Sequence, residues 1–165
     1  MPHASTRGAR AGFGVLLVLA SLGAACERTP VDGAPTPAIA AGGDLPTVQI
    51  ADNFEATLWK LDPYTIDSAR IAGDTLTIAL HHGGGCATHT FALAASRAFR
   101  ESVPVQVSAV LTHDAAGDRC EALLTRTLQY DLRPLRDAYR RAYRTQDGSL
   151  VIHLWHASQS VRYEF

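Results

Sequence analysis

The run Val103-Pro-Val-Gln-Val-Ser-Ala-Val-Leu-Thr-His113 decides the fold, because apolar residues occupy every second position in it. Successive side chains of a strand point to opposite faces, so this alternation predicts a β-strand with one buried face. The residues on that face are Val103, Val105, Val107, Ala109 and Leu111. By the same alternation, His113 points inward beside Leu111.

Neighbouring segments follow the same pattern. Short apolar stretches separated by Gly and Asp predict strands over residues 64–71, 75–82, 88–94, 120–130, 150–155 and 161–165. The first two flank Ala72-Gly-Asp74, which predicts a hairpin turn. Leu76, Ile78 and Leu80 share the buried face of the second strand. The chain is therefore expected to be mainly β, an antiparallel β-sandwich-like domain with one short helix packed on it.

The helix is expected over residues 134–144, where the apolar period changes from two to that of a helix. Pro134 suits the first helical turn. We expect Leu135, Tyr139 and Ala142 to be buried against the sheet. Arg140 and Arg141 would then face solvent.

Residues 1–25 are typical of a signal peptide. A basic stretch holding Arg7 and Arg10 precedes the apolar run Phe13-Gly-Val-Leu-Leu-Val-Leu-Ala20, and small residues follow. The apolar run is much shorter than the roughly 20 residues that span a bilayer as a helix. The N-terminus therefore predicts export rather than a permanent transmembrane helix.

The segment Leu22-Gly-Ala-Ala-Cys26 predicts lipidation of Cys26, because small residues before a cysteine admit the lipoprotein peptidase. The alternative is ordinary secretion with cleavage near Ala25, which would leave a free thiol in an oxidising compartment. Acyl chains on Cys26 would anchor the protein to a membrane. Glu27, in place of Asp, favours the periplasmic face of the outer membrane.

Composition predicts how the rest of the chain is organised. Residues 26–46 are rich in Pro, Ala, Gly and Thr, which predicts a flexible tether after the lipidated cysteine, and residues 47–165 would form one β-rich globular domain. The content of 47% hydrophobic residues excludes a disordered protein. A formal net charge of −1 gives no electrostatic reason to expect nucleic acid as a partner.

Cysteines and histidines gather in two segments. Once Cys26 is assigned to lipid, Cys86 and Cys120 remain as a pair, which in an exported protein predicts a disulfide worth about 3–4 kcal/mol. His89 and His113 should both point inward near that bridge. Three interpretations stay open: two thiolates and two imidazoles binding zinc or copper, a histidine-only metal site helped by His81 or His82, or neutral histidines hydrogen-bonded to backbone or to Asp118.

Other features have narrower interpretations. The glycines Gly83 to Gly85 lack the Lys-Ser/Thr of a phosphate loop, so we interpret them as a turn with unusual backbone angles. Alternation along residues 120–130 puts Arg126 on the apolar face, where it would need a carboxylate such as Asp118 or an anionic ligand. The sequence contains no Gly-x-Ser-x-Gly or His-Glu-x-x-His motif, so an enzyme is the weaker hypothesis.

Two segments carry a resemblance to known proteins. Gly-Gly-Cys-x-x-His-x-Phe within residues 83–91, and the later His…Asp-x-Cys-Glu-Ala within residues 113–122, resemble a group of uncharacterised bacterial envelope lipoproteins. The resemblance covers most of residues 64–135 and implies architecture and location only. In that group His81 and His82 stand where other residue pairs are expected, which argues against a shared histidine site there.

Two hypotheses for function follow. The first is a non-enzymatic envelope module that binds an envelope protein or a small ligand. The second is a periplasmic zinc- or copper-binding protein that uses His89 and His113.

Overall fold

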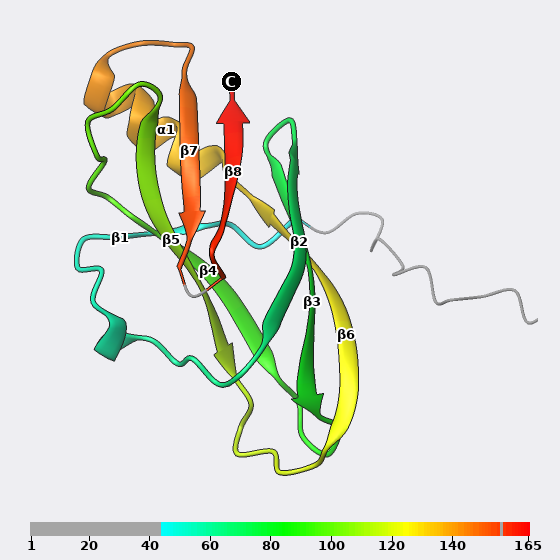
Figure 1. Ribbon diagram of the computed structural model, residues 1–165. Coiled ribbons are helices and arrows are strands. Elements are labelled where there is room, and N and C mark those ends of the chain that lie inside the picture. The colour runs from blue at the N-terminus through cyan, green and yellow to red at the C-terminus, as the bar shows by residue number, and fades with distance from the viewer. Residues whose placement is uncertain (1–43, 156) are drawn as a thin grey trace, which may run out of the picture. The chain divides into compact units, whose positions relative to one another are not determined.

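The computed structural model describes residues 44–155 and 157–165, so the predicted signal peptide, Cys26 and most of the predicted tether lie outside the described residues. Along these described residues, eight strands, one short 3-10 turn and one helix follow each other (Figure 1). They are β1 (Gln49–Ala51), η1 (Ala56–Leu58), β2 (Thr65–Ala72), β3 (Thr75–Gly84), β4 (Thr90–Ser96), β5 (Val105–Asp114), β6 (Ala122–Asp131), α1 (Arg133–Tyr143), β7 (Ser149–Leu154) and β8 (Gln159–Glu164). Within the described residues, no helix is both long and apolar enough to cross a bilayer.

The strands form two sheets, with orders β1-β4-β5-β7-β8 and β2-β3-β6. One hydrophobic cluster joins residues of both sheets and of the helix, which confirms a β-sandwich-like domain with one helix packed on it. Two strand pairs differ from the antiparallel arrangement that the sequence predicts, since β1 pairs with β4 and β5 with β7 in parallel. Parallel neighbours need a crossover between them, and here the chain passes through the other sheet each time.

The alternating run places its side chains as predicted from residue 105 onward. Val107, Ala109, Leu111 and His113 are all at most 1% exposed. The strand begins at Val105 rather than Val103, whose side chain is fully exposed. Pro104 explains the later start, since a proline has no N–H to donate to a neighbouring strand.

The helix begins after Leu132 and ends at Tyr143, and the next residue, Arg144, adopts a left-handed backbone conformation. Leu135 and Tyr139 are buried, whereas Ala142 is exposed, so the predicted burial of Ala142 was wrong. The last turn of α1 instead packs Tyr143 against Phe99, with 5.8 Å between ring centroids.

Replacing Tyr139 by alanine should reduce the free energy of unfolding by about 3 kcal/mol. Its ring packs edge-on against Phe165 and Phe99, at centroid distances of 5.3 and 5.8 Å, and truncation would leave a cavity. Urea unfolding followed by circular dichroism measures the change. Arg141→Ala, on the exposed side of α1, is the control and should stay within about 0.5 kcal/mol of wild type. Equal stability of the two variants would contradict the packing of α1.

Candidate functional site

Three buried imidazoles meet where β3, β4 and β5 come together. His82 lies near the end of β3, His89 directly precedes β4, and His113 is near the end of β5. Their exposed fractions are 2%, 9% and 1%. One ring nitrogen from each lies within 4.8 Å of the others. We call these three residues the histidine cluster.

A chain of hydrogen bonds runs through two of the rings. His113 Nδ1 donates to the carbonyl oxygen of Asp62 at 3.0 Å, and His113 Nε2 lies 2.8 Å from His89 Nδ1. His89 Nε2 lies 3.1 Å from Asp118 Oδ2. The hydrogen bonds thus link a backbone carbonyl, two imidazole rings and a carboxylate in one chain. Burial of the ring lowers the pKa of His113.

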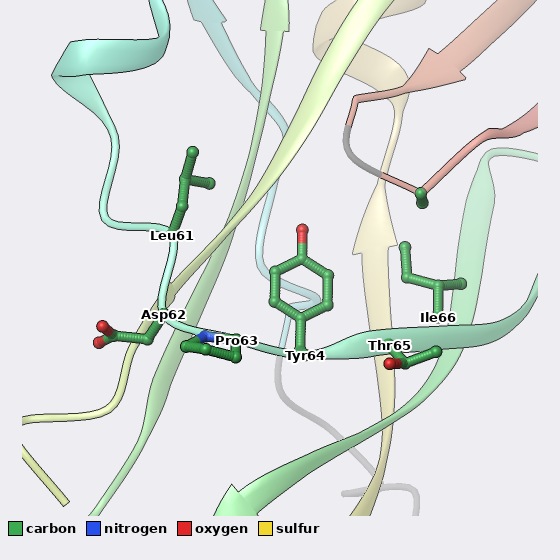
Figure 2. A pocket seen from close by; sticks show the side chains of 7 residues that line it. Leu61, Asp62, Pro63, Tyr64, Thr65 and Ile66 are labelled. Atoms are coloured by element: carbon green, nitrogen blue, oxygen red, sulfur yellow. The ribbon is translucent and has the colours of Figure 1, made fainter.

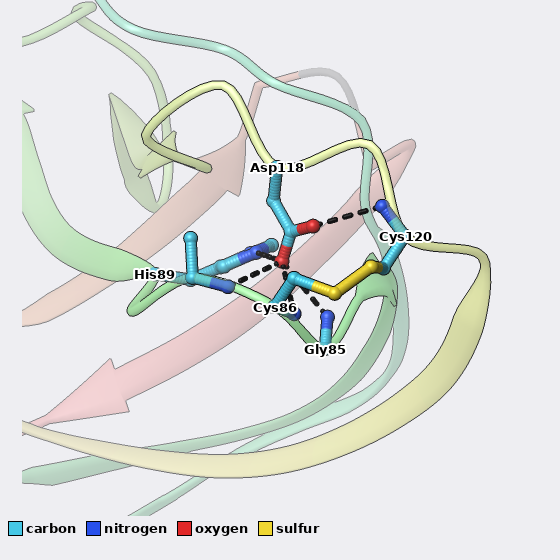
Figure 3. Close-up of a disulfide and its surroundings, with 6 residues drawn as sticks. Gly85, Cys86, His89, Asp118 and Cys120 are labelled. Carbon is cyan, nitrogen blue, oxygen red and sulfur yellow. Dashed lines mark hydrogen bonds and ion pairs between the residues drawn. A yellow bond between two sulfur atoms is a disulfide. The ribbon is translucent and has the colours of Figure 1, made fainter.

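Asp118 is held by a cradle of backbone N–H groups (Figure 3). Its Oδ2 atom accepts hydrogen bonds from Gly85, Cys86 and Ala87 at 2.8, 2.8 and 2.9 Å, and its Oδ1 atom accepts one from Cys120 at 2.8 Å. These bonds, with those from Cys120 and Ala87 contributing most, hold the pKa of the Asp118 carboxyl well below its usual range. The side chain is therefore a carboxylate although solvent does not reach it.

The glycine turn makes this cradle possible. Gly84 and Gly85 have φ angles of +138° and +123°, which side-chain-bearing residues rarely adopt. A Cβ atom on Gly84 would lie 2.6 Å from the His89 ring. The turn thus binds an anion, as phosphate loops do, but the anion is the chain's own carboxylate.

His82 has one ring nitrogen with a partner and one without. Its Nδ1 atom donates to the Gly83 carbonyl oxygen at 2.8 Å, and an imidazole that carries its single proton on Nδ1 has a lone pair on Nε2. Among the described residues, that buried Nε2 has no hydrogen-bond partner. The His82 ring centroid lies 4.5 Å from that of His89 and 5.1 Å from that of His113. The Nε2 atom of His82 therefore lies beside the other two rings without a partner among the described residues.

Cys86 and Cys120 form the disulfide that the sequence predicts, with a Cα–Cα distance of 5.9 Å that is typical of such bonds. The disulfide lies against the Asp118 cradle (Figure 3). Because both sulfurs are bonded to each other, a metal site with two cysteine thiolates and two histidines does not form.

Two sequence interpretations need correction. Arg126 is exposed, so its predicted burial was wrong. Residues 125–127 are solvated on both faces of β6, because β6 is an edge strand of its sheet among the described strands and this part of it leaves the core. The structure also places His82 beside His89 and His113, unlike what the resemblance implies, whereas the His81 ring pairs with Asp67 at 2.7 Å. The alternation that predicts inward-facing side chains at Leu76, Ile78 and Leu80 continues to His82, so it could have identified His82 as a third inward-facing histidine.

A pocket of about 330 Å³ lies along the segment that follows Lys60 (Figure 2). The backbone of Lys60 and Asp62 is hydrogen-bonded to that of His113. Leu61 to Ile66 and Ala157 line it. The Tyr64 hydroxyl already donates to the Leu111 carbonyl oxygen at 2.7 Å, and burial raises the pKa of Tyr64 to about 12. The Tyr64 ring also meets the His113 ring edge-on at 5.9 Å. The pocket is therefore lined mainly by one segment, whose phenol is already engaged.

Comparisons with known proteins assign this chain to no family. No family model matches the chain, and no curated protein matches it. Among solved structures, a NigD-like immunity protein from Bacteroides caccae has a TM-score of 0.47 at 17% identity, and the match covers 74% of this chain and 64% of that one. A candidate lipoprotein from Bacteroides fragilis has a TM-score of 0.46 at 9% identity, covering 74% and 70%. Similarities of this size do not identify a function, and the resemblance to envelope lipoproteins stays a prediction.

Replacing Gly84 by alanine should destabilise the protein by about 3 kcal/mol, because the new Cβ combines an unfavourable φ angle with a clash against His89. Thermal or urea unfolding measures the loss. The matched control is Gly83→Ala, where a Cβ meets nothing within 4 Å, and a change within about 0.5 kcal/mol is expected. Similar values for both variants would show that the turn does not pack against His89 as described.

Proposed function

We propose that this protein is a non-enzymatic, lipid-anchored protein of the cell envelope that binds a zinc or copper ion through His82, His89 and His113. The proposal thus combines the two hypotheses from the sequence: the protein is a binding module, and its ligand is a zinc or copper ion. The observation that carries the proposal is the unpartnered, buried Nε2 of His82 beside two other imidazoles. A purely structural role accounts for the hydrogen bonds of His89 and His113 but leaves this nitrogen unexplained.

The outer nitrogens of the cluster support metal binding. These are the ring nitrogens that point out of the cluster, and each faces a fixed acceptor. The acceptors are the Gly83 carbonyl for His82, the Asp118 carboxylate for His89 and the Asp62 carbonyl for His113. Histidine ligands of metals almost always donate their second ring N–H to a carbonyl or carboxylate in this way. Three nitrogens, His82 Nε2, His89 Nδ1 and His113 Nε2, then remain for an ion.

The donor set suits zinc or copper, since imidazole nitrogen favours these ions. Tetrahedral bonds of 2.0–2.1 Å require ligand nitrogens about 3.3 Å apart. His89 Nδ1 and His113 Nε2, now 2.8 Å apart, would separate by about half an ångström as the ion replaces the proton between them. A fourth position would remain for another ligand. The near-complete burial of the cluster favours retention of an ion over catalysis on a substrate.

Protein produced without a histidine tag should bind one equivalent of Zn²⁺ or Cu²⁺, and His82→Leu should abolish binding while keeping the fold. Isothermal titration and elemental analysis measure the stoichiometry. An ion at one hundred times its dissociation constant should raise the free energy of unfolding by about 2.7 kcal/mol.

The control is His81→Leu on the same strand, which lies outside the cluster and should bind the ion like wild type. Metal-free protein with no uptake of either ion would refute the proposed function. Equal loss of binding in both variants would show that binding does not depend on the cluster.

The envelope location is supported by the N-terminal sequence alone. Cells fed a radiolabelled fatty acid should incorporate the label into the wild-type protein and not into Cys26→Ser, because the thiol of Cys26 receives the diacylglycerol. Fractionation should recover wild-type protein with the outer membrane. Incorporation of label into the Cys26→Ser variant would refute lipidation at this residue.

A further inference from the structure

We propose that the Cys86–Cys120 disulfide controls metal binding by the histidine cluster, so that the metal site is complete only in the oxidised chain. This inference rests on the proposed function. The disulfide acts as a positioning element, since its sulfurs are not ligands and its effect passes through Asp118.

The disulfide joins the two loops at the point where the strand ladder between them stops. The last paired residues of β3 and β6 are Gly84 and Ala122. Cys86 and Cys120 each lie two residues beyond that pair, and their bond links the loop after β3 to the loop before β6. The covalent bond therefore continues the connection that hydrogen bonds between strands provide up to that point.

The same two loops meet at Asp118. The backbone N–H groups of the two cysteines donate to opposite oxygens of its carboxylate, Cys86 to Oδ2 and Cys120 to Oδ1, both at 2.8 Å. Oδ2 is also the atom that faces His89 Nε2 at 3.1 Å. A shift of either loop thus moves the acceptor that fixes the orientation of the His89 ring.

Burial gives these loops little other support. Residues 85–88 and 116–117 are exposed, so few apolar contacts hold the loops together. Segments with few buried contacts open at low free-energy cost. Without the disulfide, the loop after β3 would separate from Asp118 more often, and His89 would lose its fixed partner.

The redox step is a thiol–disulfide exchange with a small dithiol or a dithiol protein. The sulfur–sulfur bond accepts two electrons and two protons from the dithiol, which leaves two cysteine thiols and converts the dithiol to a disulfide. Cys86 is exposed and can be attacked. A chain that has not yet been oxidised would then bind the ion weakly, and tight binding would begin after export to an oxidising compartment.

The test uses the full chain with Cys26→Ser, in which Cys86 and Cys120 are the remaining cysteines. Zn²⁺ affinity is compared between this protein and the same protein carrying Cys86→Ala and Cys120→Ala. Alanine is chosen because thiols released by a reductant would themselves bind zinc. Loss of an outer partner of a metal ligand typically costs 10–100-fold in affinity, so we expect at least about tenfold weaker binding.

A double-mutant cycle with Asp118→Asn tests whether the effect of the disulfide on metal binding passes through Asp118. Asp118→Asn with the disulfide intact should weaken Zn²⁺ binding by about 10–100-fold. Removing the cysteines in the Asp118→Asn protein should then have little further effect, because both changes interrupt the same path. Circular dichroism of the metal-free proteins shows whether each variant is folded.

The outcomes separate the two proposals. No Zn²⁺ or Cu²⁺ binding by the oxidised protein would refute the proposed function, and this inference with it. Normal affinity in a folded cysteine-free variant would overturn the redox control and leave the metal site standing. If the cysteine-free variant does not fold, Asp118→Asn decides alone: unchanged affinity in that variant overturns the inference.

Discussion

The rest of the site depends on the hydrogen bonds that the Asp118 carboxylate accepts. A carboxylate removed from solvent is costly unless its oxygens accept hydrogen bonds, and here four backbone N–H groups and the His89 ring face it. The carboxylate thereby sets both the conformation of the glycine turn and the orientation of His89.

Different forces hold the sandwich and the site. The core is apolar burial contributed by both sheets and α1, and it fixes the strands that carry His82 and His113. His89 and Asp118 lie on loops at one end, where covalent and polar bonds replace apolar contact. Because the loops have little hydrophobic support, a change in their bonding can alter the site while the core remains folded.

The corrections share one physical origin. Arg126 and Ala142 each followed a correct local period, yet each lies on a part of its element that the core does not cover, and Val103 lies before the strand begins. A period in the sequence states which residues share a face, but whether that face is covered depends on what packs against it. The parallel pairing of β5 with β7 was missed for the same reason, since pairing partners are chosen among segments distant in sequence.

The sequence by itself determined the class of fold, most strand positions to within two residues, the helix and the pairing of Cys86 with Cys120. Local periodicity and the count of cysteines contain that information. It also placed His89 and His113 on inward faces, and the same alternation extended by one step would have added His82. Only the tertiary structure decided that these three rings converge, that Asp118 closes the chain of hydrogen bonds, and that one nitrogen of His82 is left without a partner among the described residues. The physical reason is that these contacts join segments separated by up to 51 positions, at distances set by how two sheets pack, which no local pattern encodes.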